Sequence, residues 1–330
     1  MTDASRPPLL DVQGLTTVFP TRAGAARVVD DVSFHVAEGE CLGVVGESGS
    51  GKSITFLSVL GLVRPPGKVS AARMIFAGQD LLALDEIARR AIRGRDIAIT
   101  MQDALTALNP ALTVATQITE VMLAHDRAGS MDEARAAAVE MMRLVGIPAA
   151  ADRLDDYPHQ FSGGMRQRIM IATALACRPR LLIADEPTTA LDVTIQAQVL
   201  ELIADLRREL GMSVVLITHD LGVVVEQADR IMVMYAGQIV EEGAAREVIE
   251  RAAHPYTVGL LNSMPSLDTL DRPIHPIRGQ APMPGPMPAV CRFIDRCEQA
   301  TEACRAAIPL HDLGAGRASR CVLNAGGSHG

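Results

Sequence analysis

Up to about residue 250, short apolar runs rich in β-branched residues alternate with alanine-rich stretches. The runs that have the length of buried strands lie at residues 40–45, 96–101, 181–184 and 213–218. A further segment, 231–242, has the pattern of a hairpin that turns at Ala236-Gly237. Strands that alternate with helical stretches are typical of α/β proteins built around a sheet, so the pattern predicts an α/β fold.

Helical periodicity dominates the middle of the chain, between about residues 104 and 165. Two helices are predicted there, at 111–127 and 131–145, and Gly146 and Pro148 are signals that end the second one. Further helices are predicted at 54–62 and 163–177.

The composition changes near residue 250, where proline becomes frequent. The prolines of this stretch, which fall within 24 residues, are Pro265, Pro273, Pro276, Pro282, Pro284, Pro286 and Pro288. Because proline lacks the amide donor and has a fixed φ, we expect an extended, non-helical segment. We therefore divide the chain into a domain at 1–250 and an extension at 251–330.

The overall composition argues against a disordered chain and against a protein that binds free nucleic acid. Hydrophobic residues make up 48% of the 330 residues, too many for a disordered chain. The formal net charge is −8, from 31 Lys+Arg against 39 Asp+Glu, so we expect no nucleic-acid partner. We find no apolar run long enough to cross a bilayer and no secretory signal, and therefore expect a cytosolic chain without structural disulfides.

The segment GESGSGKS at 46–53 matches the phosphate-binding pattern G-x-x-x-x-G-K-[ST] between a predicted strand and a predicted helix. Glycines let the backbone curl so that its amides face phosphate oxygens, and the helix N-terminus adds a positive dipole end. Lys52, one of two lysines in the chain, would reach the β- and γ-phosphates, and the Ser53 hydroxyl would ligate Mg²⁺. The predicted phosphate-binding residues are Gly46, Ser48, Gly49, Ser50, Gly51, Lys52 and Ser53.

Two adjacent carboxylates, Asp185 and Glu186, follow the apolar run at 181–184. A charged carboxylate at the end of a buried strand is costly unless a cation accompanies it, and Mg²⁺ is the natural partner. Since adjacent side chains diverge, Asp185 can hold the metal while Glu186 polarises the attacking water. An acidic loop without catalytic function would look the same in isolation, and the phosphate-binding motif favours the catalytic interpretation.

The segment FSGGMRQR at 161–168 resembles the signature motif of ABC-type ATPases. Ser162 is also a favourable N-cap for the predicted helix, which would by itself explain a serine there. The resemblance implies that Ser162, Gly163 and Gly164 face the γ-phosphate of ATP held by an opposite subunit, in keeping with the anion preference of helix N-termini. Phe161 stands where the family usually has leucine.

Four more residues match positions of the ABC family. The resemblance implies that Gln102 senses Mg²⁺ and the membrane partner, and that Asp192 lies at the dimer seam. It also implies that His219, which follows a predicted strand, contacts the γ-phosphate. Phe19 is the candidate for the aromatic ring that stacks on adenine, with a place in the core as the alternative.

Between about residues 9 and 323 the chain resembles the oligopeptide/dipeptide (and nickel) importer ATPases of the ABC family. The segments that carry this resemblance are QD followed by LNP at 102–110, YPHQ at 157–160, HPYT at 254–257 and the cysteine-containing tail. Met101 and Ala104 depart from the family's usual residues near Gln102. The resemblance implies an ABC-type P-loop ATPase core with an antiparallel β-subdomain, a helical subdomain at about 104–165 and a Cys-containing C-terminal extension.

The same resemblance implies a subunit that hydrolyses ATP, with Mg²⁺, to power the import of di- and oligopeptides. Its implied partners are two transmembrane permease subunits, a second ABC ATPase that is a paralogue or a second copy, and an extracytoplasmic solute-binding protein. Its implied location is the cytoplasmic face of the cell membrane. The alternatives are import of nickel or another small solute, a soluble iron–sulfur ABC ATPase that acts on ribosomes or nucleic acid, and a redox-sensing regulator.

Four cysteines in the extension, Cys291, Cys297, Cys304 and Cys321, have the spacing C-x5-C-x6-C-x16-C. Four thiolates suit a [4Fe–4S] cluster or one tetrahedral zinc ion, and the missing C-x2-C pairs argue against zinc. The resemblance also favours the cluster, since some peptide-importer ATPases are thought to carry one. The third alternative is that the tail binds no metal. Cys41 and Cys177 are predicted to be buried thiols.

Overall fold

The chain folds into two units in the computed structural model, which describes residues 7–22, 24–189, 191–263, 276–283, 285–287 and 289–325. The first unit consists of residues 1–37, 41–82 and 217–330. The second consists of residues 38–40 and 83–216. The phosphate-binding motif and the C-terminal extension therefore belong to the same unit.

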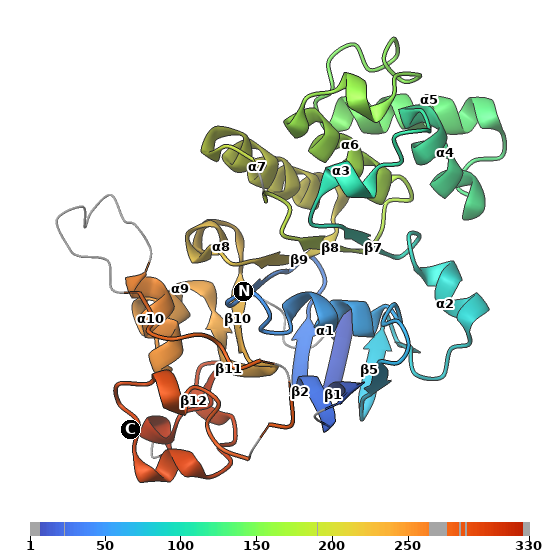
Figure 1. Cartoon of the computed structure of the whole chain (residues 1–330). Coiled ribbons are helices and arrows are strands. Elements are labelled where there is room, and N and C mark those ends of the chain that lie inside the picture. Colours follow the sequence, from blue (N-terminus) through green and yellow to red (C-terminus); the bar gives the residue numbers. More distant parts are fainter. Residues whose placement is uncertain are drawn as a thin grey trace. The chain divides into compact units, whose positions relative to one another are not determined.

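An antiparallel sheet forms the N-terminal part of the first unit (Figure 1). Its strands are β1 (Leu10–Thr21), β2 (Gly24–Val36), β4 (Lys68–Ser70), β5 (Arg73–Phe76) and β6 (Gln79–Asp80). Strands β1 and β2 pair along their full length, with shifts of register inside β1. Near the end of β2, Val32, Phe34 and Val36 are buried while the residues between them are exposed, so this face covers a core. This is the antiparallel sheet that the family resemblance predicts.

A second, mixed sheet of the same unit contains the strand that leads into the phosphate-binding motif. In spatial order, the strands of this sheet that lie wholly in the first unit are β12 (His311–Gly314), β13 (Arg317–Ser319), β11 (Gln238–Ala244), β10 (Arg230–Tyr235) and β3 (Cys41–Val45). Strand β3 is buried throughout and pairs parallel with β10. Strands β10 and β11 form the predicted hairpin, and Ala236 and Gly237 at its turn have φ values of 47° and 84°. Because β13 pairs with β11, the extension adds strands to the sheet of the preceding domain.

The first unit also contains the helices α1 (Lys52–Val59), α8 (Leu221–Gln227), α9 (Ala245–Glu250) and α10 (Pro255–Asn262). Three aromatic rings, of Tyr235, Tyr256 and Phe293, meet in its core at centroid distances of 4.6 to 5.4 Å. Phe293 comes from the extension, which is therefore part of this core. Of the proline-rich stretch, residues 264–275, 284 and 288 lie outside the described residues. The described residues 276–283 and 285–287 contain no helix or strand, as expected.

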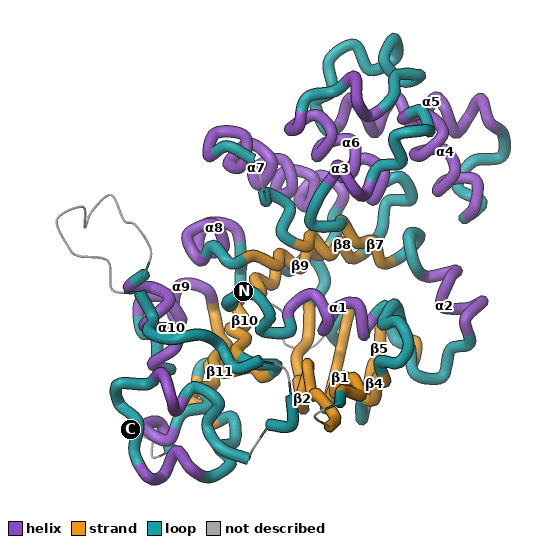
Figure 2. Tube along the Cα trace, in the orientation of Figure 1, coloured by secondary structure: helices purple, strands orange, loops and turns teal. Residues whose placement is uncertain are grey.

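The second unit is mostly helical, and Figure 2 shows its helices in purple. Its helices are α2 (Glu86–Ile92), α3 (Ala104–Ala107), α4 (Val114–Ala124), α5 (Met131–Leu144), α6 (Gly163–Leu175) and α7 (Val193–Leu210). Its strands are β7 (Ile97–Thr100), β8 (Leu181–Asp185) and the first part of β9 (Ser213–Thr218). Helices α4, α5 and α6 pack on one another. Strands β7 and β8 are parallel, so their carboxyl ends lie at the same edge.

Helix α5 shows how local sequence places these elements. The Ser130 hydroxyl accepts a hydrogen bond from the amide of Glu133 and so caps the first turn, where Asp132 and Glu133 favour the dipole. Gly146 follows the helix with a φ of 74°, as the sequence predicts. No helix in the described part of the chain is long and apolar enough to cross a membrane.

Candidate functional site

The predicted phosphate-binding loop connects β3 to α1 in the first unit, and its glycines cannot be replaced without strain. Gly46, Gly49 and Gly51 have φ values of 150°, 78° and 101°, which side chains rarely adopt. A Cβ atom on Gly46 would lie 2.2 Å from the Met234 carbonyl oxygen, and one on Gly51 would lie 2.7 Å from that of Val28. The loop is thus closely packed on β10 and β2, and its shape depends on glycine.

Lys52 points back into this loop from the start of α1. Its Nζ donates to the carbonyl oxygens of Gly46 at 2.7 Å and Glu47 at 3.0 Å, and its side chain is buried. The Ser50 hydroxyl is also buried and has no hydrogen-bond partner within the described residues. A buried hydroxyl without a partner is costly, and a phosphate oxygen would satisfy it. The loop therefore fits the nucleotide phosphates that its sequence predicts.

The two predicted catalytic residues of the second unit lie in contact. Gln102 follows β7 and Glu186 follows β8, and Gln102 Nε2 donates to Glu186 Oε2 at 2.7 Å. Thr189 Oγ1 donates to the same oxygen at 3.0 Å. Glu186 has a φ of 45°, an uncommon conformation for a residue with a side chain and one often found at functional sites. The parallel pairing of β7 and β8 brings Gln102 and Glu186 together. Asp185 is the last residue of β8.

The predicted signature segment opens helix α6 in the second unit. The Ser162 hydroxyl caps this helix by accepting a hydrogen bond from the Met165 amide at 3.4 Å. Gly163 is exposed, and a Cβ atom on it would meet no other part of the described chain within 4 Å outside its own helix, so this helix end has space beside Gly163. A Cβ atom on Gly164 would lie 2.9 Å from Cγ2 of Ile195. Phe161 is buried, and the Arg153 guanidinium lies 4.0 Å from the centre of its ring. The ring thus packs well where the family usually has leucine.

Three other predicted residues lie at the ends or edges of elements. Asp192 is exposed and caps α7, because its carboxylate accepts a hydrogen bond from the Ile195 amide at 2.9 Å. His219 is exposed directly after β9. Phe19 is half-buried on β1, and its ring lies close to Gly67. The roles proposed for these three side chains stay predictions.

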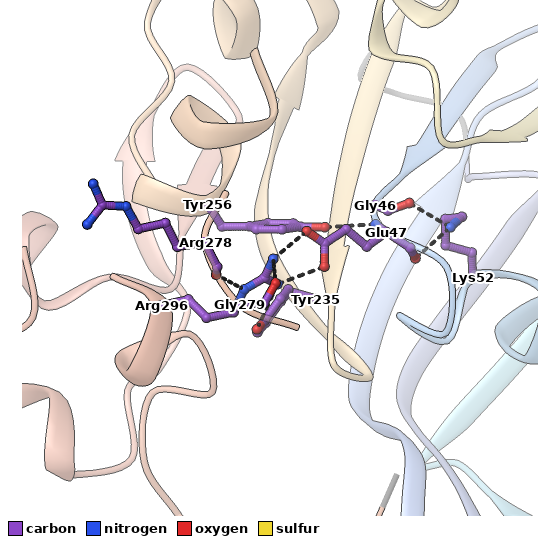
Figure 3. A network of polar contacts seen from close by, with 8 residues as sticks. All are labelled: Gly46, Glu47, Lys52, Tyr235, Tyr256, Arg278, Gly279 and Arg296. Atoms are coloured by element: carbon purple, nitrogen blue, oxygen red, sulfur yellow. Dashed lines mark hydrogen bonds and ion pairs between the residues drawn. The ribbon is translucent and has the colours of Figure 1, made fainter. Parts of the chain in front are cut away.

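The sequence did not indicate the polar contacts that surround Glu47, the second residue of the phosphate-binding loop (Figure 3). Arg296 of the extension forms an ion pair with its carboxylate, and the Tyr256 hydroxyl accepts a hydrogen bond from its amide. The ion pair raises the pKa of Arg296, which therefore stays charged, and burial raises the pKa of Tyr256. Tyr256 lies in the HPYT segment quoted above, whereas nothing local to Arg296 indicates its partner, 249 residues away.

Within the described part of the chain, the four cysteines of the extension form no disulfide bond, and Cys304 and Cys321 are buried. Burial raises the pKa of Cys291, and the neighbouring thiols of the other three raise this pKa further. Burial likewise raises the pKa of Cys297 and of Cys321. Among the described residues, however, no group of three or more His, Cys, Asp or Glu side chains is arranged to hold a metal ion. The predicted iron–sulfur centre is therefore not confirmed. Cys41 and Cys177 are buried, as predicted.

Comparison with known proteins decides the family. Residues 29–189 match the ABC transporter family, and residues 240–304 match the oligopeptide/dipeptide transporter C-terminal region. The chain is 49% identical over 307 residues to the dipeptide transport ATP-binding protein DppD of Haemophilus influenzae, covering 93% of each protein. It is 47% identical over 314 residues to the protein of the same name from Escherichia coli, covering 95% of this chain and 96% of that one. The chain is an ABC transporter ATPase.

Solved structures of ABC cassettes have the same fold as this ABC ATPase. A dimeric cassette in a post-hydrolysis state, bound to ADP and Pi, matches with a TM-score of 0.64 and 28% identity, covering 72% of this chain and 99% of that one. The protein cbiO1 from Clostridium perfringens, part of the ABC transporter complex cbiONQ, matches with a TM-score of 0.62 and 25% identity, covering 74% of this chain and 92% of that one. The predicted ABC-type α/β fold is therefore confirmed.

Proposed function

We propose that this ABC ATPase powers the import of di- and oligopeptides through a membrane permease. The observation that carries the proposal is similarity along almost the whole chain to dipeptide transport ATP-binding proteins, including the C-terminal region characteristic of oligopeptide/dipeptide transporters. Nickel or another small solute, or a ribosomal or nucleic-acid substrate, finds no support in these relatives. The partners are two permease subunits, a second ATPase and an extracytoplasmic solute-binding protein, and the location is the cytoplasmic face of the membrane.

Reconstitution of the chain with its permease, partner ATPase and binding protein in liposomes tests this function. We expect ATP-dependent accumulation of a labelled dipeptide, because hydrolysis by this subunit supplies the driving force. The matched control is the same preparation with labelled nickel in place of the dipeptide. Accumulation of nickel without dipeptide would contradict the peptide assignment and leave the ATPase assignment in place.

For the nucleotide, we propose that Lys52 and the glycine-rich loop hold the β- and γ-phosphates of ATP. The closed shape of the loop and the buried Ser50 hydroxyl support this. The oxygen donors of Ser53, Gln102 and Asp185 would hold Mg²⁺, a hard cation that offsets phosphate charge when bound. Glu186 polarises the attacking water and His219 contacts the γ-phosphate. The hydrogen bond from the Gln102 amide to the Glu186 carboxylate supports a role for both residues in the same catalytic step.

We further propose that the N-terminal end of α6 acts on ATP held by a partner ATPase. Ser162, Gly163 and Gly164 would approach the γ-phosphate there, with Asp192 at the dimer seam and Phe19 beside the adenine of the chain's own nucleotide. Helix N-termini favour anions, and the space beside Gly163 leaves room for the approach. ATP that contacts both subunits would close the dimer, and hydrolysis would release it.

For the extension, we propose that the four thiols hold a [4Fe–4S] cluster. The proposal rests on donor chemistry and on the spacing of the four cysteines in the sequence, since the described side chains are not arranged to hold a metal ion. Since burial raises the pKa of three of these thiols, they are protonated at neutral pH, and cluster binding would have to displace protons.

Iron and acid-labile sulfide in anaerobically purified protein test the cluster. We expect about four irons per chain, and loss of most of them in Cys304→Ser. The control is Cys177→Ser, which removes a buried thiol of the second unit and should retain the iron. Folded, ATP-hydrolysing protein without iron would exclude the cluster and leave the transport function unaffected.

A further inference from the structure

Arg296 forms a bidentate ion pair with Glu47 of the phosphate-binding loop. Its two terminal nitrogens donate to the two carboxylate oxygens of Glu47 at 2.7 and 2.9 Å, and only 7% of its side chain is exposed (Figure 3). Bidentate arginine–carboxylate pairs are geometrically specific and stronger than exposed ion pairs. This contact therefore fixes where the second residue of the loop lies.

Hydrogen bonds also fix the backbone amide and carbonyl groups of Glu47. Its amide donates to the Tyr256 hydroxyl at 2.8 Å, and its carbonyl oxygen accepts from Lys52 Nζ at 3.0 Å. Tyr256 is fully buried on α10, so its hydroxyl has little freedom to move. Glu47 thus joins the C-terminal part of the chain to the lysine proposed to bind phosphate.

Arg296 is itself oriented by its surroundings. It donates to the carbonyl oxygens of Arg278 at 2.9 Å and Gly279 at 3.4 Å, while the Arg278 side chain points away from the network (Figure 3). Its guanidinium also lies 5.7 Å from the ring centre of Tyr235 and 5.8 Å from that of Phe293. The extension therefore presents Arg296 to the loop in a fixed direction.

A second arginine of the extension is linked to the same loop through the turn between β10 and β11. Arg292 is 6% exposed and donates to the Ala236 carbonyl oxygen and to the carboxylate of Asp30. Ala236 belongs to the β10–β11 turn, and the next residue, Gly237, donates its amide to the Ser50 carbonyl oxygen at 2.8 Å. The turn held by Arg292 thus holds the loop at Ser50.

We infer that Arg296 is a positioning residue for ATP binding, through which the C-terminal extension presets the phosphate-binding loop by way of Glu47. A glycine-rich loop loses much conformational freedom when it closes on phosphate, so contacts that fix it beforehand increase nucleotide affinity. Arg296 contacts the carboxylate of Glu47, whose carbonyl oxygen accepts a hydrogen bond from Lys52, and it would act on the nucleotide through these two residues. The inference rests on the proposed assignment of this loop as the nucleotide site.

The test compares Arg296→Gln with the wild-type full chain. We expect the Kd for MgADP and the KM for MgATP to rise about tenfold, as for loss of a charge-assisted contact, while kcat changes less than about twofold. Arg296→Lys keeps the positive charge but cannot form the bidentate contact with Glu47, so it should recover only part of the nucleotide affinity. The matched control is Arg305→Gln, from an exposed pair with Glu302 in the same extension, which should bind nucleotide as the wild type does.

A double-mutant cycle with Glu47→Gln separates positioning from general stability. If Arg296 acts through Glu47, the double variant should bind MgADP no more weakly than the weaker single variant. An unchanged Kd in Arg296→Gln, with only a lower Tm, would overturn the inference. The variant Lys52→Ala tests the proposed nucleotide site separately. If Lys52→Ala binds nucleotide as the wild type does, the loop is not the nucleotide site; if it binds weakly while Arg296→Gln has an unchanged Kd, only the inference about Arg296 is wrong.

Discussion

Replacement of Lys52 by alanine should lower the rate of ATP hydrolysis by at least about 100-fold. The side chain is buried at the base of the glycine-rich loop, with its ammonium group between the carbonyl oxygens of Gly46 and Glu47. Its removal deprives the β- and γ-phosphates of the cation proposed to bind them. Steady-state ATPase assays and MgADP calorimetry on the purified full chain measure the effect.

The chain provides a well-matched control in its other lysine. Lys68 is exposed on β4, and Lys68→Ala removes the same charge from the same unit. We expect that variant to hydrolyse ATP at the wild-type rate. Full activity in Lys52→Ala would refute the assignment of the loop to phosphate, whatever the behaviour of Lys68→Ala.

Replacement of Glu186 by glutamine should separate ATP binding from hydrolysis. A general base contributes about 10²- to 10⁴-fold, so we expect turnover to fall by about 1,000-fold while nucleotide affinity is kept. The folded structure should persist, because the glutamine oxygen can still accept the hydrogen bonds that Gln102 and Thr189 donate. Since closed dimers form on ATP and open after hydrolysis in the proposed cycle, this variant should accumulate as a dimer, which light scattering with MgATP would detect.

Glu201→Gln is the corresponding control, since Glu201 is an exposed glutamate on α7 of the same unit. It should hydrolyse ATP normally and form no persistent dimer. Undiminished turnover in Glu186→Gln would remove Glu186 from the general-base role. Slow turnover without dimer accumulation would instead argue against ATP as the bridge between subunits.

Elements that depend on local signals were predicted from the sequence. The helix at 131–145 has its cap at Ser130 and its stop at Gly146, and the structure has α5 there. The hairpin turn at Ala236-Gly237 was also predicted, because positive φ values at a short turn favour glycine. In both cases the residues that determine the element lie within it or directly beside it.

Individual strands that depend on distant partners were not located from the sequence, although the family resemblance implied an antiparallel sheet. The long β1–β2 pair received no specific prediction, although the alternation of apolar and polar residues at the end of β2 was a usable signal. Strand β1 carries shifts of register that obscure such alternation. Likewise, strands β12 and β13 are short and are stabilised by pairing with the sheet rather than by their own propensity.

The sequence by itself determined which residues are candidates for the chemistry of this protein. The predicted phosphate-binding loop, the carboxylate pair after a buried strand and the predicted signature segment are contiguous motifs, because each function proposed for them needs backbone groups or neighbouring side chains of a single turn. Only the tertiary structure decided which distant residues act together. Gln102 meets Glu186 across 84 residues because two parallel strands end at one edge, and Arg296 meets Glu47 across 249 residues because the extension packs into the core beside the loop. Such contacts leave no periodic or local trace in the sequence, since they depend on packing between elements rather than on any one element.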